Sequence, residues 1–100
     1  MVKEAKQEFS ALIDQIADIA RKRHKISKEK GELLNRTGLI HATFFLAINK
    51  AINEKGKPLY GNERARDAAV MLKIAEDKEH QQLRERLREL NDEDEELLIQ

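Results

Sequence analysis

Three side chains of this sequence have the chemistry to bind a divalent metal ion, namely His41, Glu76 and His80. Glu76 and His80 lie four residues apart, so they share one face of a helix, and the antiparallel register derived below sets His41 opposite Glu76. Two imidazoles and one carboxylate are ligands that zinc accepts. Metal sites in helical bundles, however, use a Glu-x-x-His spacing, which these residues lack. A polar layer in a helical seam is the favoured interpretation, and we predict neither a metal site nor a cofactor.

A cluster of cations in residues 21–30, RKRHKISKEK, is a second candidate site. Its side chains Arg21, Lys22, Lys25 and Lys28 could contact a nucleic-acid backbone and release counterions from it. No aromatic residues interleave with them to stack on bases. The sequence has 19 basic and 19 acidic residues, so no overall field attracts nucleic acid. A solvated helix face is the favoured interpretation, and nucleic-acid binding is the weaker alternative.

The remaining polar residues do not indicate catalysis, and we predict that the protein is not an enzyme. The sequence has no glycine-rich phosphate loop before a helix and no cysteine, which excludes disulfides and thiolate chemistry. The longest apolar-rich segment, residues 39–52, is too short to span a bilayer. The N-terminal segment lacks the apolar stretch of a secretory signal. We therefore expect no membrane association and a cytoplasmic location.

Two long helices are expected to position these residues. Along the first half of the sequence, steps of four and three residues alternate between mostly apolar positions, a 3.5-residue repeat typical of a helix with a coiled-coil seam. We predict a first helix over about residues 3–55. The seam positions are Ala5, Phe9, Leu12, Ile16, Ile19, Arg23, Ile26, Lys30, Leu33, Thr37, Ile40, Phe44, Ala47 and Ala51.

The segment GKPLYGN, residues 56–62, contains two glycines and the only proline, which disfavour a helix. We predict a turn over about residues 56–61. Asn62 is suited to cap the helix that follows, which we expect over about residues 62–99. The expected inward positions of this second helix are Ala65, Ala69, Leu72, Glu76, His80, Leu83, Leu87, Leu90, Asp94 and Leu97.

The inward spacing of the second helix contains a stutter. Two successive four-residue steps separate Leu72 from His80, which locally unwinds a supercoil. Asp77 is also suited to cap a new start of helix there. We therefore predict a kink near residues 76–80.

The two helices are expected to pair antiparallel, with residue i near residue 117 minus i. This register places Leu90 beside Ile26. It also sets the acidic run 92–96 against the basic residues of the first helix, so that Arg23 reaches Asp94. The apolar pattern and the charge pattern agree on one topology, which favours it.

The sequence therefore predicts a single all-α domain over residues 1–100, folded as a long antiparallel helical hairpin with coiled-coil-like packing. An alternative is a three-helix bundle in which the first helix breaks between Ser27 and Gly38. Gly31, Asn35 and Gly38 lower helix propensity there. No proline or capping pair marks a stop, so the hairpin is preferred.

Apolar residues beyond the expected contacts of the hairpin predict self-association. In the register above, residues 1–16 extend past the end of the second helix, and the segment before the turn is apolar on all sides, which requires neighbours on more than one face. Soluble monomers rarely tolerate such patches. We expect a homo-oligomer, most simply a dimer that forms a four-helix bundle. The expected oligomer interface comprises Phe9, Leu12, Ile13, Ile16, Leu39, Phe45, Leu46 and Ile52.

The second half of the sequence carries three short elements that resemble small helical-hairpin proteins of unassigned function encoded by phages, prophages and some bacterial genomes. These elements, within residues 56–90, are the turn Lys57-Pro58-Leu59-Tyr60, the helix start Asn62-Glu63, and the later group Asp77, Glu79, His80 and Gln81. His80 stands where an aromatic residue is expected. The resemblance implies a hairpin and suggests an accessory protein of a mobile element, but no particular chemistry.

Two functions from different classes are compatible with these features. The leading hypothesis is a self-associating helical scaffold or adaptor that binds a protein partner. The alternative is a phage-type accessory factor in DNA replication or recombination, and a metal-dependent helical enzyme is a third, weaker class. Salt-dependent binding to DNA would separate the first two, and metal analysis of the purified protein would test the third.

Overall fold

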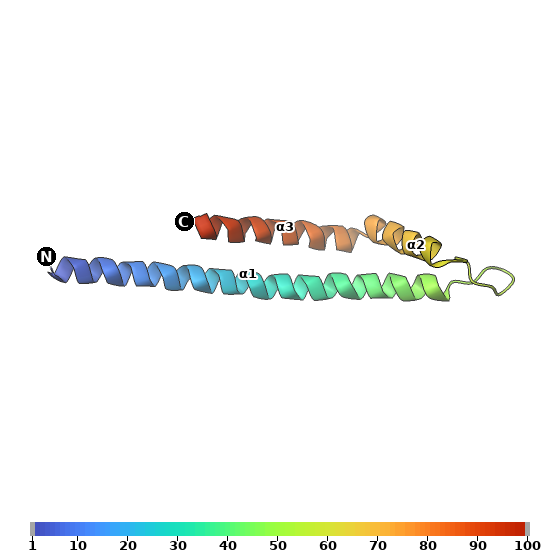
Figure 1. The fold of residues 1–100 in the computed structure, drawn as a ribbon, viewed down its shortest axis with the longest axis horizontal. Coiled ribbons are helices and arrows are strands. Elements are labelled where there is room, and N and C mark those ends of the chain that lie inside the picture. The colour runs from blue at the N-terminus through green and yellow to red at the C-terminus, as the bar shows by residue number, and fades with distance from the viewer. Residues whose placement is uncertain (1, 100) are drawn as a thin grey trace.

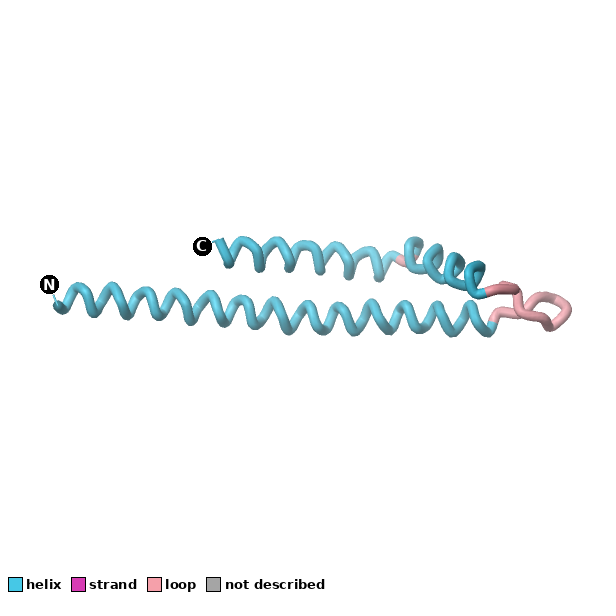
Figure 2. The backbone as a smooth tube through the Cα atoms, viewed as in Figure 1, coloured by secondary structure: helices cyan, strands magenta, loops and turns pink. Residues whose placement is uncertain are grey.

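The computed structural model describes residues 2–99 and shows an all-α antiparallel hairpin (Figure 1). Helix α1 (Val2–Lys50) forms one arm, and helices α2 (Glu63–Glu76) and α3 (Lys78–Ile99) return along it to form the other (Figure 2). The molecule is a rod of 86 × 20 × 15 Å. Its radius of gyration is 23.0 Å, whereas a compact domain of this length has about 13 Å.

Helix α1 is one unbroken helix of 49 residues. The alternative fold, a three-helix bundle with a break between Ser27 and Gly38, is therefore wrong. Each glycine in this stretch costs about 1 kcal/mol relative to alanine, but no proline removes a hydrogen bond from the helix there. The seam also continues through the stretch, because Leu33 is half-buried and Ile40 is buried.

Helix α1 ends at Lys50, earlier than the boundary near residue 55 that the spacing predicted. The side chain of Asn53 provides the reason. Its Oδ1 accepts hydrogen bonds from the backbone N–H groups of Lys55 at 2.9 Å and Lys57 at 3.1 Å, which competes with helical hydrogen bonding. Gly56 then adopts a φ of +76°, a left-handed conformation that favours glycine. The loop between the arms is accordingly longer than expected.

A single residue, Asp77, separates α2 from α3. Its backbone is extended, and its Oδ2 accepts a hydrogen bond from the backbone N–H of His80 at 2.8 Å, so it caps the start of α3. The kink predicted near residues 76–80 lies at this residue. Asn62 caps α2 in the same way by accepting a hydrogen bond from the backbone N–H of Ala65 at 2.8 Å.

The core is a narrow seam between α1 and the returning arm. Among residues 2–99 five apolar side chains are buried, and Leu90 is the only one with no exposed surface. The other four are Ile26, Ile40, Ile48 and Val70. The half-buried residues around them on α1 and α3 follow the predicted heptad positions, and they include Ile19, Leu33, Phe44, Leu83, Leu87 and Leu97.

Three ion pairs join α1 to α3: Arg23–Asp94 at 3.0 Å, Glu29–Arg86 at 2.8 Å and Arg36–Glu79 at 2.6 Å. The residue numbers of these pairs add up to between 115 and 117, which confirms the predicted register. The pair Arg23–Asp94 is the one that the opposed charges predicted. Exposed ion pairs contribute at most about 1 kcal/mol, so these contacts specify alignment more than they stabilise the fold.

The predicted inward face of α2 is right at Ala65 and Ala69, which are half-buried, but wrong in the second half of the helix. Leu72, expected in the seam, is 64% exposed, and Glu76 is also exposed. Val70 and Ile74 lie inward instead, with Val70 buried and Ile74 half-buried. The prediction continued the seven-residue spacing of α3 backward into α2. The extended backbone at Asp77 breaks the helix, so this spacing does not carry over into α2. Helix α2 therefore has an inward face of its own.

Candidate functional site

The N-terminal part of α1 extends well past the end of α3, and Figure 1 shows no other described element alongside it. Four apolar side chains on this part are between 49% and 66% exposed. Leu12 lies one heptad before the half-buried Ile19, so the group continues the face of α1 that packs against α3 further along. We call these four residues the overhang surface: Phe9, Leu12, Ile13 and Ile16.

A second group of exposed apolar side chains lies at the other end of the rod, near the loop. Leu39 immediately precedes the buried Ile40, and Phe45 immediately follows the half-buried Phe44. At about 100° per residue, these two side chains turn away from the seam in opposite directions, toward the far side of α1. Ile52 lies in the loop, just beyond the end of α1. We call it the outer surface: Leu39, Phe45, Leu46 and Ile52, between 46% and 63% exposed.

All eight residues of the predicted oligomer interface are therefore exposed, but they form two separate surfaces. The overhang surface faces the same side of α1 as α3, and the outer surface faces the opposite side. Along the chain, residues 9–16 and residues 39–52 are more than twenty residues apart. A straight helix packed on one of these surfaces cannot also cover the other.

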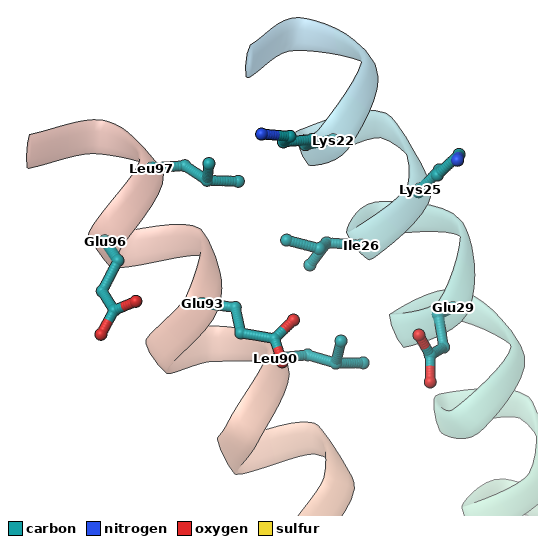
Figure 3. Close-up of a pocket in the computed structure, with 8 residues that line it drawn as sticks. All are labelled: Lys22, Lys25, Ile26, Glu29, Leu90, Glu93, Glu96 and Leu97. Carbon is teal, nitrogen blue, oxygen red and sulfur yellow. The ribbon is translucent and has the colours of Figure 1, made fainter. Parts of the chain in front are cut away.

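A shallow groove lies beside the seam where α1 meets α3 (Figure 3). The apolar side chains of Ile26, Leu90 and Leu97 point toward one another across the gap between the helices. Charged side chains surround them, with Lys22, Lys25 and Glu29 on α1 and Glu93 and Glu96 on α3. Small-molecule sites need polar groups that converge on the ligand, whereas these charges lie around the rim and carry both signs. The groove is best described as the open edge of the hairpin seam.

Arg86 organises the charges next to this groove. Its Nε and one terminal nitrogen donate hydrogen bonds to the two carboxylate oxygens of Glu29, at 2.8 and 3.2 Å. It also lies 3.2 Å from Glu89 and 3.5 Å from Glu93. The hydrogen bonds from Arg86 lower the pKa of Glu29 below its ordinary value, and the same contacts raise the pKa of Arg86. This cluster therefore stays charged and joins the two arms.

The cations suggested for nucleic-acid contact, Arg21, Lys22, Lys25 and Lys28, are all exposed on α1. Arg21 and Lys22 both lie near the carboxylate of Asp18, at 3.6 and 3.3 Å. Lys25 lines the groove whose other side is acidic. Neighbouring carboxylates therefore offset much of the positive charge of this stretch.

The three residues considered for metal binding do not come together. His41 and Glu76 are exposed and His80 is half-buried. No group of three His, Cys, Asp or Glu side chains in the described part of the chain could hold a metal ion. The hypothesis of a site built from these three residues is therefore wrong, and the interruption at Asp77, which turns Glu76 out of the seam, is the physical reason.

A further exposed apolar region, which was not predicted from the sequence, lies on α2. Met71 is 71% exposed and lies beside the exposed Leu72. Leu72 also lines a shallow groove together with Tyr60 and three alanines, Ala65, Ala68 and Ala69. Ala65 and Ala69 were predicted as inward positions of α2, and both are half-buried. The exposure of Leu72 could not be predicted, because the break at Asp77 changes which side of α2 faces α1.

Comparison of this chain with protein-family models, with curated proteins and with solved structures finds no match. None of the helices described in residues 2–99 is long and apolar enough to cross a membrane. The function must therefore be inferred from the surfaces and charges of the chain itself.

Proposed function

We propose that this chain is a non-enzymatic helical scaffold that associates with copies of itself and offers its remaining surface to a protein partner. The observation that carries the proposal is the apolar surface that the hairpin leaves open. The overhang surface and the outer surface consist of large aliphatic and aromatic side chains that are about half exposed or more. Contiguous patches of this kind are typical of interaction sites rather than of isolated soluble monomers.

The total exposed area supports the same proposal. The chain exposes 8421 Å², whereas a compact monomer of 11.6 kDa exposes about 5,800 Å². The excess of roughly 2,600 Å² arises because two arms side by side cover only one face of each other. In a bundle of four helices each helix has neighbours on two sides, so a second hairpin would remove much of this excess.

Light scattering on the purified chain tests the proposal. At tens of micromolar we expect a mass above the 11.6 kDa of one chain. Replacing Leu12 and Ile16 with Asp should lower the measured mass, because it weakens association through the overhang surface. Replacing Phe45 and Leu46 with Lys should lower it through the outer surface, because a charge in an apolar interface is costly to desolvate.

A matched control for the overhang variant is the pair Gln7→Asp and Ser10→Asp. These exposed positions lie in the same part of α1 but away from its apolar face, so the added charges should leave the mass unchanged. A wild-type mass of 11.6 kDa, with full helicity by circular dichroism, would contradict self-association.

A further inference from the structure

Three residues of the outer surface, Leu39, Phe45 and Leu46, lie within the longest stretch of sequence without charge. Residues 37–49, TGLIHATFFLAIN, contain no Asp, Glu, Lys or Arg, although 38% of all residues are charged. The returning arm covers the side of this stretch that carries Ile40, Phe44 and Ile48. The far side remains exposed. A helix segment that is apolar on all sides requires neighbours on more than one of them, so this segment lacks one neighbour.

The far side of this stretch also has room for close approach. Gly38 lies one heptad before Phe45, on the same side of α1. A Cβ atom at Gly38 would meet no other atom within 4 Å. Packing within the chain therefore does not require glycine there, although glycine costs about 1 kcal/mol in a helix interior. Ala42 lies four residues further on, so the middle of this surface is small enough for another helix to come near.

The charged residues near this stretch indicate what packs against its exposed side. Arg36, directly before the stretch, pairs with Glu79 of the returning arm. Glu32, four residues earlier, and Lys50, directly after the stretch, are both exposed, and neither forms an ion pair within residues 2–99. If a second copy packs antiparallel with Ala42 at the centre, the position opposite Glu32 of one copy is two residues, about 3 Å along the helix, from Lys50 of the other, which the two long side chains can span. A parallel arrangement would instead place like charges opposite each other, which is unfavourable.

We propose that the outer surface is the interface with a second copy of this chain, packed antiparallel about a two-fold axis near Ala42. This inference rests on the self-association proposed above and specifies its geometry. Leu39 and Phe45 lie three residues on either side of Ala42, so the axis packs Leu39 of one copy against Phe45 of the other. The Phe45 ring of each copy then lies over the space left by Gly38 of the other.

The same axis pairs two polar residues. Asn35 and Asn49 lie one heptad on either side of Ala42, on the middle line of this face. Antiparallel pairing sets Asn35 of one copy opposite Asn49 of the other, where their amides can hydrogen-bond. A polar pair within an apolar helix interface fixes its register at some cost in stability.

Disulfide cross-linking tests the geometry directly, because the sequence has no cysteine of its own. Asn35→Cys and Asn49→Cys are made as separate variants of the full chain, one carrying a mass tag. Under mild oxidation we expect a mixture of the two to form mixed dimers, and each variant alone to remain largely uncross-linked. Efficient cross-linking of each variant with itself would indicate a parallel interface and overturn the proposal.

Light scattering on the same samples separates this proposal from the more general one. An oligomer that forms no mixed cross-link would overturn the antiparallel interface while leaving self-association intact. If the chain is monomeric in these samples, both the antiparallel interface and self-association are overturned.

A substitution at Gly38 provides an independent test. Gly38→Leu should weaken association at least tenfold, because its side chain would occupy the space needed by Phe45 of the second copy. The helicity of the monomer should not fall, since the position is open within the chain. Ser10→Leu is the matched control, because it adds the same side chain on the same side of α1 but far from Ala42. Wild-type association by the Gly38 variant would overturn the proposed contact.

Exchange of the flanking charges tests the direction of packing. Glu32→Lys should weaken association several-fold, because the introduced lysine would lie near Lys50 of the second copy. The double variant Glu32→Lys with Lys50→Glu should restore it, because the opposite charges meet again. Failure of the double variant to recover any association would contradict antiparallel packing.

Discussion

At the scale of single residues, the hairpin depends on very few buried side chains, and Leu90 is the most important of them because none of its surface is exposed. Replacing Leu90 with Ala should lower the free energy of unfolding by about 3 kcal/mol, through lost burial and the cavity left behind. Leu34→Ala is the matched control, since Leu34 is 57% exposed and its truncation should cost less than about 0.5 kcal/mol. Chemical denaturation of dilute samples measures both changes. Equal losses would contradict the central role of Leu90.

The charged pairs of the hairpin make its stability depend on pH. Hydrogen bonds from Arg86 lower the pKa of Glu29, and hydrogen bonds from Arg36 lower the pKa of Glu79. A carboxyl group whose pKa is lower in the folded chain than in the unfolded chain stabilises the fold above its ordinary pKa of 4.5. This stabilisation is lost as the pH falls from 4.5 through the lower value of the folded chain.

We therefore expect the free energy of unfolding to decrease as the pH is lowered below 4.5. Glu29→Gln should make this decrease smaller, because the amide that replaces the carboxylate does not take up a proton in this range. Glu8→Gln is the control, since Glu8 is exposed and forms no ion pair in the described residues. Denaturation curves at several pH values measure the effect, and identical pH dependence for the wild type and Glu29→Gln would argue against it.

At the scale of the elements, Asp77 decides the shape of the returning arm. Its carboxylate accepts the hydrogen bond from His80 that caps α3, and its extended backbone resets the inward face of α2. Asp77→Ala should lower the free energy of unfolding by about 1 kcal/mol, because an N-terminal hydrogen-bond donor of α3 loses its acceptor. Asp77→Asn keeps an acceptor oxygen and should cost much less. Equal effects of the two substitutions would show that the cap contributes little.

Helix α1, helix α3 and their register could be predicted from the sequence because two independent patterns agreed on them. The heptad spacing placed Ile26 beside Leu90, and the opposed charges placed Arg23 beside Asp94, at 3.0 Å in the structure. Both patterns extend over many residues, so a local error hardly affects them. Continuous seam positions also outweighed the glycines that suggested a break in α1.

The parts that could not be predicted depend on single local contacts. The end of α1 follows from the hydrogen bonds of the Asn53 side chain, whose strength spacing does not reveal. The inward face of α2 follows from the backbone angles of Asp77. Because the side of α2 that faces α1 was not known, Leu72 and Glu76 were placed in the seam. The hypothesis of a metal site depended on the same error, since it used Glu76 as an inward residue. Composition and periodicity describe long elements well but do not fix the angle at which one element follows another.

At the scale of the whole molecule, the rod has two apolar surfaces that face in opposite directions. The sequence showed that both groups of residues lack partners, because both lie outside the contacts that two helices can make. It did not show that the surfaces lie on opposite sides of α1, since that follows from the observed side on which the returning arm packs. The dimeric four-helix bundle expected from the sequence was assumed to bury both surfaces at once. In this geometry, a dimer built on the outer surface leaves the overhang surface open.

This geometry predicts that the two surfaces act independently in assembly. If each one pairs with a copy of itself, every chain has two interfaces, and the mass of the wild type should rise with concentration beyond twice 11.6 kDa. The outer-surface variant, Phe45→Lys with Leu46→Lys, should then stop at the dimer formed through the overhang surface. The overhang variant, Leu12→Asp with Ile16→Asp, should stop at the dimer formed through the outer surface.

The combined variant should be monomeric, because free energies of association at distant sites are additive. Sedimentation velocity over a range of concentrations distinguishes these species by mass and by shape, since a rod of 86 Å that lengthens by end-to-end association sediments differently from one that thickens. A wild type that remains a dimer at every concentration would contradict the double assembly. The overhang surface would then remain open in the dimer and be the part of the scaffold available to a different protein.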